Sequence, residues 1–159
     1  MQFVLFALDE QRYALALASV QRAVRVVNVT PLPKAPPSVL GIINVKGDIV
    51  PVYDLRRRFH LTEREIELAD QLIIATTSRQ TVALLVDSVS GVFEVAEEEI
   101  ASANKILPEI EYVHGVVKLA DGLVLIHDLE QFLSADEERI LDEALQSVTG
   151  PQDSLMIND

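Results

Sequence analysis

Short apolar blocks interrupted by polar turns run along most of the chain, and this spacing predicts β-strands joined by hairpins. The apolar residues of 3–8 and 13–17 flank a polar stretch, 9–12, a pattern typical of a hairpin. The residues that follow, 18–27, fit a short helix as well as a strand. Turn chemistry predicts three further hairpins, with connections at residues 44–48, 77–80 and 120–122.

Prolines and aspartates mark where the strand pattern stops. Residues 30–37 contain four prolines, which remove amide donors, so this stretch is predicted to be a surface connection that ends in a brief helical turn near Ser38. Pro51 predicts a strand position that faces an edge or a bulge. Asp54 and Asp128 each follow an apolar strand, and each is predicted to cap a short helix.

The clearest helical pattern lies near the end of the chain. Ser134 and Glu137 have the spacing of a capping box, and Gly150 and Pro151 predict the stop. The residues after the helix, 149–159, are predicted to form a mobile tail. The apolar face of the predicted amphipathic helix contains Ile140, Leu141, Ala144, Leu145 and Val148.

A weak internal repeat relates the two halves of the chain through two alignments, each without a gap. The first alignment places Gly41, Val50, Asp54 and Leu55 on Gly115, Val124, Asp128 and Leu129. The second alignment places Gln11, Ala14, Leu15, Ser19 and Val20 on Gln80, Ala83, Leu84, Ser88 and Val89. The repeat predicts two similar β-modules of about 65–75 residues, and their short, closely spaced strands favour small barrels over a sheet with helical crossovers.

Composition and charge narrow the classes of function. The chain has 159 residues, a hydrophobic content of 49% and a net charge of -12, which fits one globular domain. Residues 1–93 carry 10 basic and 9 acidic side chains, whereas residues 94–159 carry 3 and 16. The acidic second half would be repelled by phosphate, so no nucleic-acid partner is expected. The start lacks a signal-peptide pattern and no apolar run is long enough to enter a membrane, so a cytoplasmic protein is predicted.

The sequence lacks the motifs that most enzymes and metal sites require. There is no cysteine, and His60, His114 and His127 have no metal-binding spacing. Nucleophile-elbow, phosphate-loop and dinucleotide-binding motifs are also missing, so neither catalysis nor a cofactor or metal is expected. The basic run 56–58 is predicted to be a solvated turn face.

Residues 40–59, LGIINVKGDIVPVYDLRRRF, resemble the central motif of the CheW-like family of bacterial chemotaxis adaptors. Three other stretches resemble the family's opening, middle and close: residues 3–21, 82–95 and 112–133. The matching positions of the central motif are Gly41, Asn44, Gly47, Pro51, Asp54, Leu55, Arg56 and Phe59.

The resemblance implies a mainly β fold in which residues 1–148 form a single domain. Two SH3-like five-stranded barrels would pack on a shared core and exchange strands. It also implies a non-enzymatic scaffold that joins the cytoplasmic tip of a chemoreceptor to the regulatory domain of a CheA-type histidine kinase, at membrane-associated receptor arrays. The alternative is a CheW-like regulatory module that binds another output protein outside such an array, for example in pilus-based motility.

The resemblance also implies a receptor-binding groove. This chain departs from the family pattern at two positions of the groove, because Arg22 replaces the usual Glu and Lys46 replaces the usual Arg. Two cations would then lie side by side in the groove. They would favour a receptor with an acidic surface. Composition alone also fits a core role for the valines and a turn role for the glycines. The expected groove residues are Val20, Arg22, Gly41, Lys46, Gly47 and Val89.

Overall fold

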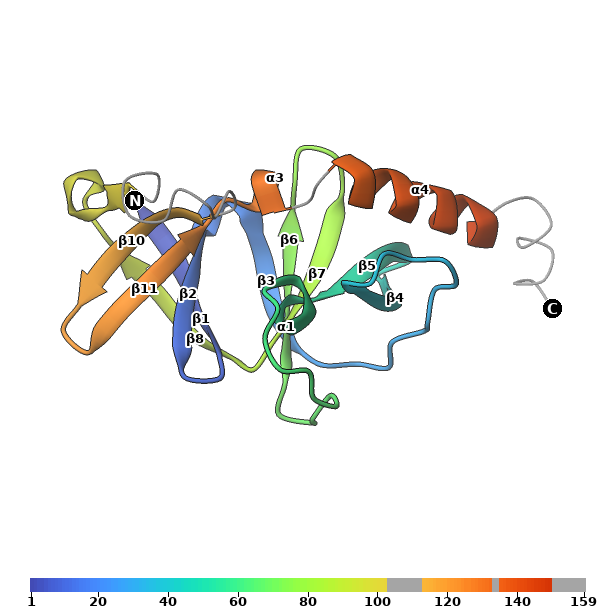
Figure 1. Ribbon diagram of the computed structural model, residues 1–159, viewed down its shortest axis with the longest axis horizontal. Coiled ribbons are helices and arrows are strands. Elements are labelled where there is room, and N and C mark those ends of the chain that lie inside the picture. The colour runs from blue at the N-terminus through green and yellow to red at the C-terminus, as the bar shows by residue number, and fades with distance from the viewer. Residues whose placement is uncertain (103–112, 133–134, 150–159) are drawn as a thin grey trace.

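The computed structural model describes residues 1–102, 113–132 and 135–149 of the chain. It shows two β-modules arranged along the long axis of the molecule, with a helix beside the second module (Figure 1). None of the helices in these described ranges is long and apolar enough to cross a membrane. The predicted tail at 149–159 falls almost entirely outside the described residues.

Two sheets build the modules. The first has the order β8-β1-β2-β11-β10-β9 and the second has the order β3-β6-β7-β5-β4. The strands of the first sheet are β1 (Gln2–Leu8), β2 (Gln11–Ala16), β8 (Ser88–Glu94), β9 (Ala101–Ser102), β10 (Val113–Leu119) and β11 (Gly122–His127). Those of the second are β3 (Val20–Arg25), β4 (Val39–Val45), β5 (Asp48–Asp54), β6 (Gln71–Thr76) and β7 (Thr81–Val86). The helices within the described residues are η1 (Leu17–Ser19), α1 (Leu55–Arg58), η2 (Glu97–Glu99), α3 (Leu129–Phe132) and α4 (Ala135–Thr149).

The two modules exchange one strand each. After β2, the chain leaves the first sheet and β3 pairs with β6, whereas after β7 it leaves the second sheet and β8 pairs with β1. Beyond each exchanged strand, the chain returns to the opposite edge of the sheet that the strand has joined. After β3, Thr30 forms a bridge with Ile42 of β4, and after β8, the strand β9 pairs with β10. This return curls each sheet toward a barrel.

The strand registers confirm the internal repeat. Val52 pairs with Ala83 in the parallel β5–β7 ladder, and Ile126 pairs with Ala14 in the parallel β11–β2 ladder. The first alignment relates Val52 to Ile126, and the second relates Ala14 to Ala83, so the two ladders are equivalent. The prediction of five strands per module is wrong for the first sheet, because the two-residue strand β9 adds a sixth.

In the part of the chain that the structure describes, the buried apolar side chains form three clusters. One lies inside each module, and the third joins the modules through residues such as Phe6, Tyr53 and Leu84. Along β7 the side chains alternate between the shared cluster (Leu84) and the interior of the second module (Leu85), so both faces of the strand are buried. This explains the uninterrupted apolar run in this strand, and it confirms the predicted shared core.

Most local predictions agree with the structure. The β4–β5 turn has positive φ angles at Lys46 (52°) and Gly47 (93°), as a type I′ hairpin requires. Pro51 belongs to the part of β5 that pairs with β4, and it precedes the part that pairs with β7. Its missing amide hydrogen therefore leaves the β5–β7 ladder intact. In α4, Leu141 and Ala144 are buried in the shared cluster, as the apolar face predicts.

Several boundaries differ from the predictions. The first hairpin turns at residues 9–10 rather than over four residues, and the ambiguous stretch 18–27 is mainly the strand β3. The chain near Ser38 forms a simple turn and not a helix. The exchanged strand β8 was not predicted as a separate element. The expected capping box at Ser134 falls outside the described residues.

Candidate protein-binding site

Val20 and Val89 occupy equivalent places at the start of the two exchanged strands. Each valine is half-buried and packs against the shared apolar cluster. Each also precedes a bulge in its ladder, between Val20 and Arg22 on β3 and between Gly91 and Val89 on β8. The two valines therefore combine a core contact with partial exposure, and their predicted role as groove walls stays a prediction.

Arg22 and Lys46 are both exposed and lie on the second module. Neither forms an ion pair with any residue that the structure describes. Across the second sheet, Arg22 of β3 belongs to a row of paired residues that ends at Gly41 of β4, on the opposite edge of the sheet. Lys46 lies beyond Gly41 along the chain, in the turn that follows β4. Strand pairing therefore does not bring the two cations side by side.

The two glycines of the expected groove have different structural roles. Gly41 is buried where the backbone at Thr30 crosses β4, and any side chain there would collide with the Thr30 carbonyl oxygen. Gly47 has open space around it and is required by its positive φ angle of 93°. Its amide donates to Asn44 Oδ1 at 2.7 Å, which fixes the turn that presents Lys46.

A cluster of five charged side chains lies where the modules meet, and sequence reasoning missed it. Arg56 Nη2 donates to Asp9 Oδ1 at 2.7 Å and to Asp87 Oδ2 at 2.6 Å. Arg64 Nη2 donates to Asp87 Oδ1 at 2.7 Å and to Asp70 Oδ1 at 2.6 Å. The prediction of a solvated basic face at 56–58 is wrong for Arg56, whose side chain is only 7% exposed. The spacing of these residues along the chain gave no signal for the cluster.

The ion pairs set the charge states of this cluster. Burial lowers the pKa of Arg56, but the hydrogen bonds to Asp9 and Asp87 outweigh this effect and raise it overall. Burial likewise raises the pKa of Asp70, but hydrogen bonds from Arg64 and from the Glu67 amide outweigh it and lower the pKa overall. The cluster therefore ties the β1–β2 turn, α1 and the β7–β8 crossing together as a charged network.

The two predicted helix caps are confirmed. The Arg56 amide donates to Asp54 Oδ1 at 3.0 Å, and the Glu130 amide donates to Asp128 Oδ1 at 3.0 Å. Asp54 is buried, and this burial raises its pKa in spite of the hydrogen bond from Arg56. Both carboxylates thus have a structural explanation in their capping bonds.

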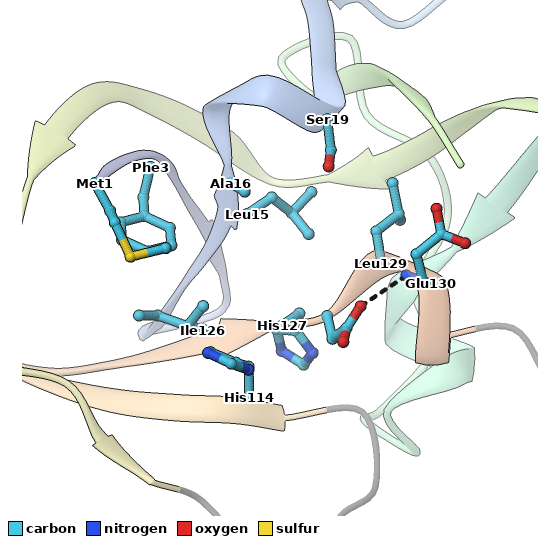
Figure 2. A pocket seen from close by; sticks show the side chains of 11 residues that line it. Met1, Phe3, Leu15, Ala16, Ser19, His114, Ile126, His127, Leu129 and Glu130 are labelled. Atoms are coloured by element: carbon cyan, nitrogen blue, oxygen red, sulfur yellow. Dashed lines mark hydrogen bonds between the residues drawn. The ribbon is translucent and has the colours of Figure 1, made fainter. Parts of the chain in front are cut away.

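A cavity of about 170 Å³ lies in the first module between β1, β2 and β11. Figure 2 shows Met1, Phe3, Leu15 and Ile126 around it, with His114 and His127 on one side. The His127 ring is buried and stacks on Phe59 with ring centroids 4.5 Å apart. Among the described residues there is no group of three or more potential metal ligands.

Comparisons with known proteins show which family this chain resembles. Residues 2–137 match the family model described as CheW-like domain. The chain is 31% identical over 142 residues to the chemotaxis protein CheW of Treponema pallidum, covering 86% of this chain and 84% of that protein. It is 27% identical over 148 residues to the chemotaxis protein CheW of Klebsiella aerogenes, covering 92% and 89%.

A solved structure has the same fold. The crystal structure of the scaffolding protein TtCheW from Thermoanaerobacter tengcongensis matches with a TM-score of 0.76 and 30% identity, over 86% of this chain and 94% of that chain. The two curled sheets, the repeated registers and the family match over residues 2–137 lead to one conclusion: the chain belongs to the CheW-like domain family.

Proposed function

We propose that this protein is a non-enzymatic adaptor that couples the cytoplasmic tips of chemoreceptors to the regulatory domain of a CheA-type histidine kinase. The observation that carries this proposal is the family match over residues 2–137, together with the fold shared with a scaffolding protein. In this role the protein acts in the cytoplasm, at receptor arrays on the inner face of the membrane, without inserting into it. It needs no cofactor and catalyses no reaction.

The charges of the second module support an acidic receptor surface. Arg22 and Lys46 are exposed and have no ion-pair partner among the described residues. The acidic second half of the chain therefore does not neutralise them through any described contact. A receptor that carries Glu or Asp opposite Arg22 would gain complementary charge on binding.

Binding measurements test the proposal directly. Calorimetry should detect association with the regulatory domain of the kinase and with a receptor cytoplasmic fragment from the same organism, at micromolar or tighter affinity. Gel filtration of all three proteins should yield a ternary complex. Absence of heat and of any complex at about 100 μM protein would exclude the array role. Binding to a different output protein instead would favour the alternative of a regulatory module outside an array.

Arg22→Glu tests the charge of the groove. The substitution should weaken binding to the receptor fragment by about 1–3 kcal/mol and make it less sensitive to salt. Lys118→Glu, which reverses an exposed cation on β10, is the matched control and should leave binding unchanged. Tighter binding by Arg22→Glu would contradict an acidic receptor surface and indicate a basic one.

A further inference from the structure

The cavity in the first module has an apolar body and an acidic end. Figure 2 shows Met1 and Phe3 at one end of the cavity and Leu129 and Glu130 at the other. Asp128, the residue before Leu129, also lines it. A protein cavity of roughly 150 Å³ with apolar walls is large enough to bind benzene. The volume of about 170 Å³ is therefore sufficient for one aromatic ring.

The internal repeat relates this cavity to a small pocket of the second module. Four residues that line the cavity have repeat equivalents that line the pocket. The pairs are Met1 and Asp70, Ala16 and Leu85, Asp128 and Asp54, and Glu130 and Arg56. Equivalent hydrogen bonds support this match, because the Val95 amide donates to the Met1 carbonyl at 2.9 Å and the Val26 amide donates to the Asp70 carbonyl at 3.1 Å. The cavity and the pocket are therefore the same place in the two modules.

In the second module, the chain that follows α1 fills this place. Arg64 lines the pocket, and its guanidinium group binds Asp70 at 2.6 Å and Asp87 at 2.7 Å. The side chain of Ile66 lines the same pocket, and Leu85 adds bulk that Ala16 lacks in the first module. Only about 10 Å³ is left empty. The groups that fill the place are therefore a guanidinium group and apolar side chains.

In the first module, the chain that follows α3 leads away from the cavity. Leu141 and Ala144 of α4 are buried in the shared cluster, and α4 lies beside the second module (Figure 1). No residue within the described part of α4 lines the cavity. The path of the chain therefore leaves open in one module the place that it fills in the other.

The charges that line the open cavity favour a cation. Asp128 and Glu130 form no ion pair with any residue in the described ranges. Glu130 accepts two hydrogen bonds from Ser78, and Asp128 Oδ1 accepts one from the Glu130 amide, but carboxylate oxygens have further lone pairs for a ligand. The amino group of Met1 donates to the Val95 carbonyl at 3.0 Å. Two carboxylates against one amino group give the lining a negative formal charge.

We propose that the first-module cavity binds a small organic cation in which one aromatic ring carries an amidinium, guanidinium or ammonium group. The ring lies against Phe3 and Ile126, and the cation faces Asp128 and Glu130. Such a ligand brings an apolar group and a cation to the place that Ile66 and Arg64 fill in the second module. The site is separate from the two protein partners of the proposed function, so each proposal can fail without the other.

Benzamidine, a ring with an amidinium group, is the probe for this site. Titration of the full chain, followed by amide chemical shifts, should give a Kd of about 1 mM or tighter, with the largest shifts at Ala16, Ile126 and Glu130. Benzoate has the same ring and the opposite charge, and it should bind at least about tenfold more weakly. Absence of shifts at about 10 mM benzamidine overturns the inference. Shifts confined to the second module, or equal binding of benzoate, overturn it as well.

Two variants test the walls of the cavity and its charge. Ala16→Leu introduces the side chain found at the equivalent Leu85 and should lower the affinity for benzamidine at least about tenfold, because it fills the space. Glu130→Gln keeps an oxygen that can accept from Ser78 but removes the charge, and it should weaken benzamidine binding about two- to fivefold. Glu98→Gln on η2, outside the lining, is the matched control and should bind as the wild type does.

Circular dichroism establishes that each variant is folded before its affinity is compared. Unchanged benzamidine binding by folded Ala16→Leu overturns the inference. Equal affinities of Glu130→Gln and Glu98→Gln also overturn it, and this comparison remains decisive if Ala16→Leu does not fold.

Discussion

Two corners of the molecule occupy equivalent places in the two modules but are held by different chemistry. In one corner, Arg56 of α1 reaches the β1–β2 turn and donates to Asp9. In the other, Glu130 of α3 reaches the β6–β7 connection, where it accepts from the amide of Ser78 at 2.6 Å and from its hydroxyl at 2.7 Å. The two alignments of the internal repeat relate Arg56 to Glu130 and Asp9 to Ser78, so the same backbone geometry carries opposite charges.

The surroundings of the two corners explain how far each interaction extends. Arg56 is almost fully buried and also contacts Asp87, which in turn binds Arg64. Glu130 is exposed, and its bonds to Ser78 form a local contact. The comparison teaches that the repeat conserves the placement of helix and turn, while burial separates an exposed pair of hydrogen bonds from a network that also includes Asp87 and Arg64.

The largest effect on stability is expected when the contacts of Arg56 are removed and those of Glu130 are kept. Arg56→Ala removes the buried guanidinium group that binds Asp9 and Asp87, and we expect a loss of about 3 kcal/mol in the free energy of unfolding. Glu130→Ala removes an exposed contact and should cost about 0–1 kcal/mol. Urea denaturation of both variants measures the difference. Equal losses would mean that burial does not distinguish the corners.

The second effect concerns the glycines at which each barrel is crossed by the returning chain. Gly41→Ala should cost about 2–3 kcal/mol, because the new methyl group meets the rigid Thr30 backbone. Gly115→Ala should cost less, about 1–2 kcal/mol, because the added carbon meets the Ile100 Cγ2 methyl group at 2.5 Å and the Ala101 carbonyl oxygen at 2.9 Å, whereas at Gly41 the backbone oxygen is closer. Thermal unfolding of the two variants checks the order, and a larger loss for Gly115→Ala would contradict it.

The smallest expected effect is one that the two corners share. Asp54→Ala and Asp128→Ala each remove one capping hydrogen bond and should each cost about 1 kcal/mol. Folded Asp54→Ala protein should still bind the kinase domain and the receptor fragment. Urea denaturation followed by calorimetry tests both statements, and lost binding at unchanged stability would show that capping is the wrong account of Asp54.

Local sequence was sufficient for many elements of the fold. The type I′ turn at Lys46 and Gly47, the cap at Asp54 and the buried face of α4 all depend on residues within a few positions of one another, so propensity and periodicity reveal them. The repeat was also visible, because the equivalent strands of the two modules carry similar apolar patterns. For the expected groove, the sequence supplied residues through a family resemblance, and their binding role stays a prediction.

Tertiary structure alone decided the features that join distant segments. The exchange of β3 and β8 depends on which sheet offers a free edge, and a strand's own sequence does not encode its partner. Arg56 looks like its neighbour Arg57 in sequence, yet it is buried because α1 points it toward Asp9 and Asp87, 47 and 31 residues away. Local patterns determine elements, whereas burial and charge pairing depend on which elements meet in space.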